Sequence, residues 1–161
     1  MRTDFKNRIK TINKELFMKR ILLCCCLLLV AAGLFATSLV PYRIGYPDSC
    51  KIISDDMGVK MMGKEVDSGI YFKVDTYVLY DLKGQYREVT FTAGVSDEYN
   101  DERNLSLLHF YIDGVKVKTL SFNKGKAPES CTIPLDYRKQ LKVVSECKGT
   151  NYAVMTDINF K

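Results

Sequence analysis

Residues 21–40 contain no charged side chain, and this run of twenty residues limits most strongly what the chain can become. As a helix it would be about 30 Å long, which matches the hydrocarbon core of a bilayer. Its eleven Leu, Ile, Val and Phe residues would together favour insertion by roughly 3–6 kcal/mol. We therefore expect a transmembrane helix over 21–40 with a tethered domain after it.

The charges on either side of this run predict its orientation. Residues 1–20 contain seven Lys or Arg and two acidic residues, whereas residues 21–161 contain seventeen of each kind. Because positive flanks remain in the cytoplasm, we expect a basic cytoplasmic arm at 1–20 and an extracellular C-terminal domain. The excess positive charge lies in the arm and the rest of the chain is neutral, so we expect no nucleic-acid partner.

A cleaved signal peptide is the alternative interpretation of the same segment. The apolar region of a signal peptide is normally shorter, and the Leu-Phe-Ala at 34–36 is a poor match to an Ala-x-Ala cleavage site. Three cysteines at 24–26 lie inside the run. No small residue precedes them as a bacterial lipoprotein signal requires, so membrane-buried thiols are favoured over lipidation sites.

After a short tether at 41–49, the pattern of residues 50–161 predicts a single all-β domain. In the clearest segment Val89, Phe91 and Ala93 share one face, while Thr90 and Thr92 share the other. Many short strands without an amphipathic helix indicate an antiparallel β-sandwich. The segments with strand character are 76–82, 86–95, 105–112, 115–122, 131–135, 141–147 and 152–160.

The dipeptide Asp113-Gly114 predicts a two-residue turn that joins two of these strands in a hairpin. Such a turn fixes which side chains lie opposite each other across the hairpin. The expected register has two pairs in a buried row and two in an exposed row: Ile112 with Val115 and Phe110 with Val117, then Tyr111 with Lys116 and His109 with Lys118.

The sequence contains little that indicates catalysis. His109 is the only histidine, and the expected register places it on a solvent face beside a lysine. There is no Gly-x-Ser-x-Gly, Cys-x-x-Cys or phosphate-binding loop, so we do not expect an enzyme. An exported hydrolase whose site the sequence does not reveal is the alternative.

The cysteines beyond residue 40 number three, namely Cys50, Cys131 and Cys147. If 131–135 and 141–147 formed a hairpin, Cys131 would face Ser145, and Cys147 would lie diagonally about 7–8 Å away. That separation is too large for a disulfide, whereas a two-residue slip would align the two sulfurs. Buried thiols are therefore favoured, with a disulfide as the alternative.

Acidic residues gather between two of the expected strands, at Asp97, Glu98 and Asp101. Loops rich in carboxylate oxygens can bind calcium, but the spacing here matches no fixed calcium motif. We therefore expect no cofactor and keep a calcium ion at these three residues as the alternative.

Several short motifs, in order and suitably spaced, resemble the novel putative carbohydrate-binding module (NPCBM) family of bacterial surface proteins. The resemblance covers roughly residues 50–161 and implies a jelly-roll β-sandwich that binds carbohydrate or cell-wall glycan. The matching motifs are Gly69-Ile70, Tyr80-Asp81-Leu82 with Gly84 and Tyr86, Gly94-Val95 before Asp97, and Phe110 with Asp113-Gly114.

The chain also departs from the pattern of that family. Tyr71 and Lys73 replace a small residue and a histidine, and Val154 and Met155 replace an Asp-Trp pair, so that only Asp157 of the final motif remains. The chain contains no tryptophan. The resemblance therefore implies that the scaffold is retained, and that binding of simple monosaccharides is weak.

The loops between strands are the expected ligand-binding surface. They hold two groups of polar and aromatic residues: Tyr99, Asn100 and Arg103, then Asn151, Tyr152 and Asp157. Turn formation alone could account for such residues. The function expected is a membrane-anchored, non-catalytic glycan-binding module of a bacterial surface. The alternative is a structural or protein-interaction module of the envelope.

Overall fold

The computed structural model describes residues 39–98, 104–148 and 151–161. Within these ranges no helix is long and apolar enough to cross a membrane. The expected cytoplasmic arm at 1–20 lies outside the described residues, as does the expected transmembrane helix except for its last two residues.

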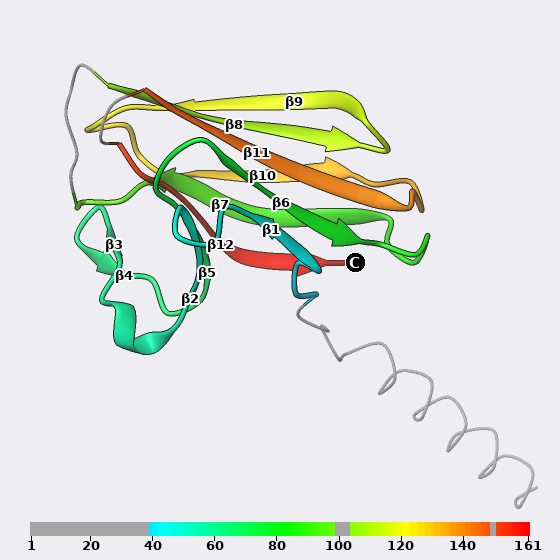
Figure 1. The fold of residues 1–161 in the computed structure, drawn as a ribbon, viewed down its shortest axis with the longest axis horizontal. Helices are drawn as coiled ribbons and strands as arrows, with labels where there is room; N and C mark the ends of the chain where they lie inside the picture. Colours follow the sequence, from blue (N-terminus) through cyan, green and yellow to red (C-terminus); the bar gives the residue numbers. More distant parts are fainter. Residues whose placement is uncertain (1–38, 99–103, 149–150) are drawn as a thin grey trace, which may run out of the picture. The chain divides into compact units, whose positions relative to one another are not determined.

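The described residues form a sandwich of two five-stranded antiparallel sheets, with a small third sheet of two strands (Figure 1). Sheet A has the order β1 (Arg43–Gly45), β6 (Thr76–Asp81), β11 (Gln140–Lys148), β8 (Leu105–Ile112), β9 (Val115–Phe122). Sheet B has the order β10 (Glu129–Pro134), β7 (Glu88–Val95), β12 (Ala153–Phe160), β5 (Gly69–Phe72), β2 (Cys50–Ile53). The remaining elements are the short helix η1 (Asp55–Met57), β3 (Lys60–Met61) and β4 (Lys64–Glu65).

The core lies between the two sheets and follows from the alternation along each strand. Val89, Phe91 and Ala93 of β7 are all buried. Phe110 of β8 is also buried, and its ring stacks on that of Phe91 with 5.0 Å between the centroids. This contact joins the two sheets, and the antiparallel β-sandwich expected from the sequence is confirmed.

A second, smaller apolar cluster lies on the outer face of sheet B. The segment 54–68, which contains η1, β3 and β4, covers the part of this face formed by β5 and β12. The buried members of the cluster are Ile53, Val59, Met61, Val66, Tyr71 and Val154. As a result, one half of the outer face of sheet B is covered and the other half remains open.

All seven strands expected from the sequence are present, with small differences at their ends. The segment expected as a tether, 41–49, instead contains β1, whose residues pair with β6. Leu39, expected near the end of the transmembrane helix, packs against the main core. The shortest strands, β1 to β5, were not predicted because two to four residues are too few to display an alternating pattern.

The hairpin register expected from the turn is correct only near the turn. Ile112 pairs with Val115 and Tyr111 with Lys116, but a β-bulge then shifts the register, so that Phe110 pairs with Lys118. Val117 consequently does not face Phe110 in a buried row. The bulge also places Thr119, rather than Lys118, opposite His109.

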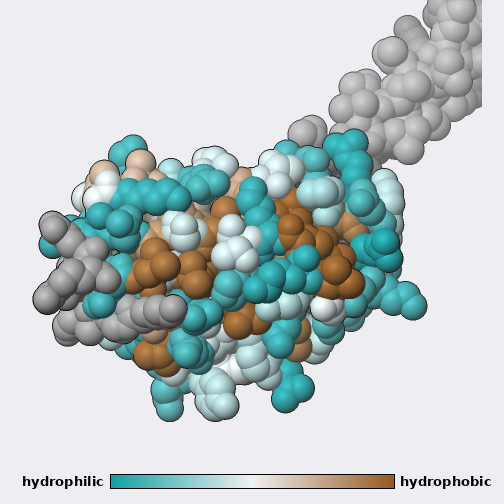
Figure 2. All heavy atoms as spheres, turned by 90° about the horizontal axis from the view of Figure 1, so that it is seen from above, coloured by the Kyte–Doolittle hydropathy of each residue, from teal (hydrophilic) through white to brown (hydrophobic). Residues whose placement is uncertain are grey.

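Val115 and Val117 are 66% and 48% exposed, because they lie on an edge strand that sheet B does not cover. They line a hollow of about 420 Å³ between β9 and β10. Figure 2 looks onto the β9 side of the sandwich, where apolar side chains are visible between polar ones. The expected burial of these two valines is therefore wrong.

The hairpin considered between 131–135 and 141–147 does not form. β10 pairs with β7 in sheet B, whereas β11 pairs with β6 and β8 in sheet A. Cys131 therefore lies opposite Phe91 and not opposite Ser145. Cys50, Cys131 and Cys147 are all free thiols, as favoured from the sequence, although Cys147 is only partly buried. Burial raises the pKa of the Cys50 thiol to about 12, so this thiol stays protonated.

Candidate ligand-binding surface

The structure does not bring the expected ligand-binding residues together at one place. Tyr99, Asn100 and Arg103 lie outside the described residues. Of the second group, Asn151 and Tyr152 precede β12, whereas Asp157 lies within it, five residues further along. At the rise of an extended strand, five residues span about 16 Å.

Asn151 and Tyr152 take part in the packing of the domain. Asn151 is buried, and its amide Nδ2 donates a hydrogen bond of 2.7 Å to the backbone oxygen of Asn104. Its backbone oxygen accepts one of 2.6 Å from Ser106 Oγ. The ring of Tyr152 packs edge-on against Tyr71, with 5.5 Å between the centroids. These contacts connect the start of β12 to neighbouring segments.

Asp157 has a different environment, because its side chain is exposed at a β-bulge. The register of β12 against β7 shifts between Thr156 and Asn159, and Asp157 has the left-handed φ of 54°. A non-glycine residue in this region is strained, and such strain is often found at functional sites. The described residues give its carboxylate neither a hydrogen bond nor an ion pair.

Two adjoining hollows, of about 450 Å³ and 290 Å³, meet at Asp157 on the open half of the outer face of sheet B. Both are also lined by Thr92. We call them together the Asp157 hollow. Its polar lining comes from the outward positions of β7, β10 and β12 and from the segment 64–68: Thr90, Thr92, Ser130, Thr132, Thr156, Lys64, Glu65, Asp67 and Ser68.

Asp97 fixes the β3–β4 hairpin, which lines one side of this hollow. The Asp97 carboxylate accepts hydrogen bonds from the backbone N–H groups of Met62 (2.9 Å) and Gly63 (2.7 Å). Thr156 Oγ1 donates a hydrogen bond of 2.7 Å to the backbone oxygen of Ser68, which ties the same segment to β12. Hydrogen bonds therefore hold the segment 62–68, which lines the hollow, at both its start and its end.

The chemistry of the Asp157 hollow is that of hydrogen bonding to hydroxyl groups. A free carboxylate accepts hydrogen bonds, while threonine and serine hydroxyls both donate and accept. Thr92 Oγ1 and Ser130 Oγ lie 3.3 Å apart, so these two hydroxyls already form a small polar array. The outward threonines were visible in the sequence as the polar half of the 86–95 alternation, but nothing there placed them beside Asp157.

The residues that depart from the family pattern lie largely in the interior. Val154 and Met155 are both buried, Val154 in the outer cluster and Met155 in the main core. Tyr71 is also buried, and its hydroxyl donates a hydrogen bond of 3.0 Å to Glu98 Oε2. Burial, together with this carboxylate, raises the pKa of Tyr71 well above its usual range. The backbone N–H of Lys73 donates to the Ser49 oxygen. In this chain these positions serve packing.

The acidic residues expected as an alternative calcium site have protein partners. Asp97 binds the β3–β4 turn, and Glu98 accepts the Tyr71 hydroxyl. Asp101 lies outside the described residues. In the part of the chain that the structure describes, no three metal-ligating side chains lie close enough together to hold an ion.

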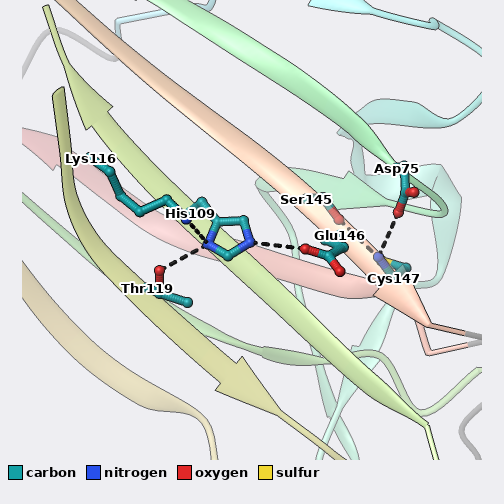
Figure 3. Close-up of polar contacts among 7 residues, drawn as sticks. All are labelled: Asp75, His109, Lys116, Thr119, Ser145, Glu146 and Cys147. Atoms are coloured by element: carbon teal, nitrogen blue, oxygen red, sulfur yellow. Dashed lines mark hydrogen bonds and ion pairs between the residues drawn. The ribbon is translucent and has the colours of Figure 1, made fainter. Parts of the chain in front are cut away.

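His109 is not the exposed residue that the hairpin register predicted, because only 12% of its side chain is accessible. Figure 3 shows it lying between β9 and β11. Its Nδ1 lies 2.9 Å from Thr119 Oγ1 and 3.3 Å from Lys116 Nζ, and its Nε2 lies 3.3 Å from Glu146 Oε2. An ammonium group can only donate, so Nδ1 accepts and the Nε2–H donates to Glu146.

Cys147 lies close to this cluster in sequence but cannot join it. Glu146 and Cys147 are successive residues of β11, so their side chains point to opposite faces of sheet A. The Cys147 sulfur lies 3.1 Å from Ser145 Oγ, on the side away from His109. The geometry therefore provides no Cys–His pair for nucleophilic catalysis.

Solved structures of carbohydrate-binding modules are similar to this fold. The CBM51 of a GH95 protein from Clostridium perfringens, in complex with methyl-galactose, has a TM-score of 0.62 and 19% identity, covering 76% of this chain and 95% of that one. The CBM51-2 and INT domains of Clostridium perfringens ZmpB have a TM-score of 0.61 and 14% identity, covering 76% and 30%.

The tandem CBM51 modules of a family 98 glycoside hydrolase from Streptococcus pneumoniae have a TM-score of 0.62 and 13% identity, covering 76% of this chain and 45% of that one. At these identities the likeness shows the fold alone. The chain spans 30% of the length of the ZmpB structure and 45% of that of the family 98 structure. No curated protein matches the sequence.

The family model of the NPCBM/NEW2 domain matches residues 41–158, which include every strand of both large sheets except the last residues of β12. The motifs of the sequence, the sandwich of antiparallel sheets and this match agree with one another. The chain belongs to the NPCBM/NEW2 domain family.

Proposed function

We propose that this protein is a non-catalytic, membrane-anchored surface module that binds a glycan in the Asp157 hollow. The observation that carries the proposal is the exposed carboxylate of Asp157, which has no partner among the described residues and lies at the junction of two hollows. Membership of a carbohydrate-binding family and the similarity to CBM51 modules support the class of ligand. The buried interactions of His109 support a role without catalysis.

A sugar suits the hollow because both are rich in hydroxyl groups. Two neighbouring sugar hydroxyls can donate to one carboxylate, and the hydroxyls of Thr92 and Thr132 can bind further positions of the ring. Met62, which is 54% exposed, borders the hollow and offers an apolar surface for the C–H face of a sugar. Among the described residues no aromatic ring faces the hollow, because the ring of Phe91 turns inward onto Phe110. We therefore expect a dissociation constant no tighter than about 0.1 mM for a monosaccharide.

Asp157→Asn is expected to weaken glycan binding about 10- to 100-fold, because hydrogen bonds to a charged acceptor contribute more than those to a neutral one. Asparagine tolerates the left-handed conformation, so the fold should remain. The full chain, purified in detergent, would first be screened on an array of galactose- and N-acetylglucosamine-terminated oligosaccharides. Titration calorimetry with the best ligand would then compare the variant with the wild type.

Asp136→Asn is the matched control, because Asp136 is an exposed aspartate with a left-handed φ of 46° that does not line the hollow. This variant should bind as the wild type does. Equal affinities of wild type and Asp157→Asn would show that the glycan binds elsewhere. Failure to bind any glycan on the array would contradict the proposed function.

The anchor and the orientation belong to the same proposal and are tested separately. The uncharged run at 21–40 and the basic arm before it support an N-terminus in the cytoplasm and a β-domain outside. Protease added to whole cells should therefore remove the β-domain and spare the arm, as followed with tags at both ends. A β-domain that is protected until the cells are lysed would show the opposite orientation.

A protein-interaction role in the envelope is the second candidate, and one observation favours it. The hollow between β9 and β10 is lined by the exposed side chains of Val115 and Val117, together with Pro134. Apolar surface of this kind suits a protein partner better than a sugar. If the array detects no ligand and Val117→Ser abolishes crosslinking to an envelope protein, this function is favoured instead.

A further inference from the structure

A row of residues paired side by side crosses all five strands of sheet A, and three of these residues are cationic. Arg43 pairs with Leu79, Leu79 with Lys142, Lys142 with Tyr111, and Tyr111 with Lys116. The cationic residues therefore occupy the first, third and fifth strands of the sheet. At the usual strand spacing their Cα atoms are about 9–10 Å apart, and the whole row is about 19 Å long.

This row faces outward. Val78, Leu141 and Ile112 neighbour its members along β6, β11 and β8, and their side chains are buried in the core. Because successive side chains of a strand alternate between faces, the row lies on the outer face of sheet A. The Asp157 hollow lies on the outer face of sheet B, so the two surfaces are on opposite sides of the sandwich.

No carboxylate of the described residues forms an ion pair with this row. Arg43, Lys142 and Lys116 form no ion pair there. The carboxylates that flank the row are engaged within the fold. Asp81 accepts from the backbone N–H of Lys83, Asp113 accepts from that of Gln140, and Glu146 accepts from His109.

Aromatic rings hold two of the three cations close to the sheet. Lys142 Nζ lies 4.8 Å from the ring centroid of Tyr77, and Lys116 Nζ lies 5.5 Å from that of Tyr111. Lys116 Nζ also donates to His109 Nδ1 (Figure 3). Cation–π contacts restrict these flexible side chains, so less conformational entropy is lost when an anion binds them.

We propose that this row is a second binding surface, which takes an acidic polysaccharide lying across the strands, with its carboxylates paired to Arg43, Lys142 and Lys116. The spacing of alternate sugars in an extended polyuronate is similar to that of the three cations. The inference rests on the proposed function only in that the ligand is a glycan; it needs neither Asp157 nor its hollow.

A bilayer surface is disfavoured as the ligand of this face. Three cations attract an anionic bilayer by only about 1 kcal/mol each, so stable binding to a membrane would also need apolar side chains that project into the lipid. On this face Leu79, Leu107 and Val144 are all half-buried between the strands, and Leu105 is 36% exposed at the end of the sheet. The face therefore presents cations over a flat surface, which suits an extended anionic chain.

Two related polymers provide the test. Oligogalacturonate long enough to span the sheet carries a carboxylate on each sugar, and its fully methyl-esterified form has the same backbone without the charge. The full chain in detergent should bind the acid at least about ten-fold more tightly than the ester, because the ester offers no partner to the cations. The difference should shrink as salt is added.

The double variant Lys116→Gln with Lys142→Gln should weaken binding of the acid roughly ten-fold. Lys51→Gln with Lys124→Gln is the matched control, because it removes the same charge from exposed positions outside sheet A's outer face, and it should leave binding unchanged. Asp157→Asn should also bind the acid normally.

Equal binding of the acid and the ester, or no effect of the Lys116 and Lys142 double variant, would overturn this inference. So would binding to phosphatidylglycerol vesicles without binding to the acid. Loss of neutral-glycan binding in Asp157→Asn, with binding to the acid absent from the wild type, would support the proposed function and refute the second surface alone.

Discussion

Phe110→Ala is expected to lower the free energy of unfolding by about 3–5 kcal/mol, the usual cost of removing a phenyl ring from a close-packed core. The Phe110 side chain is 0% exposed and stacks on Phe91 of the opposite sheet. Its removal leaves a cavity between the two layers and takes away a contact that joins them. Urea unfolding of the full chain, followed by circular dichroism, would measure the loss.

Val117→Ala is the matched control for this prediction. Val117 is on the edge strand that pairs with β8, but sheet B does not cover it, and its side chain is 48% exposed at the hollow between β9 and β10. We expect a loss of less than about 0.5 kcal/mol, as for other surface substitutions. Losses of similar size in the two variants would mean that Val117 faces the core and that the bulge is absent in solution.

Gly69→Ala is expected to be as damaging, with a loss of about 3–5 kcal/mol, because two independent constraints act at this position. Gly69 has a φ of 140°, which residues with a side chain rarely adopt. In addition, a Cβ on Gly69 would lie directly against the backbone oxygen of Met155 in β12. Relief of that contact requires β5 and β12 to separate, and their pairing is part of the core of sheet B.

Gly63→Ala separates these two constraints. Gly63 also has a positive φ, of 75°, but no atom lies within 4 Å of the position where its Cβ would be. Only the backbone strain then remains, and we expect a loss of about 1–2 kcal/mol. If Gly69→Ala proved no more costly than Gly63→Ala, the close approach of β5 to β12 would not be a feature of the protein in solution.

The same comparison explains a motif of the sequence. The Gly-Ile pair at 69–70 belongs to the family pattern, and the structure gives each residue a physical role. Gly69 lets β12 approach, while the side chain of Ile70 enters the core with 2% exposure. A larger residue at 69 would separate the strands, and a polar one at 70 would be buried without a partner.

Local patterns in the sequence identify the seven longest strands and the class of fold. Alternation along 86–95 identified an amphipathic strand because each side chain responds to its own environment, inside or outside. Asp113-Gly114 identified the hairpin turn because the conformation of a two-residue turn depends on its own residues. These signals are local, so they predict an antiparallel sandwich without indicating which strands pair.

The pairing of the strands and the surfaces that result from it depend on contacts between distant parts of the chain. The strands at 131–135 and 141–147 are neighbours in sequence, yet they lie in different sheets, because packing of each inner face against the other layer determines partners. Val117 is exposed because β9 is an edge strand that sheet B does not cover, which no local pattern reveals. The Asp157 hollow and the row of Arg43, Lys142 and Lys116 combine residues from separate strands, so no local pattern could have revealed them.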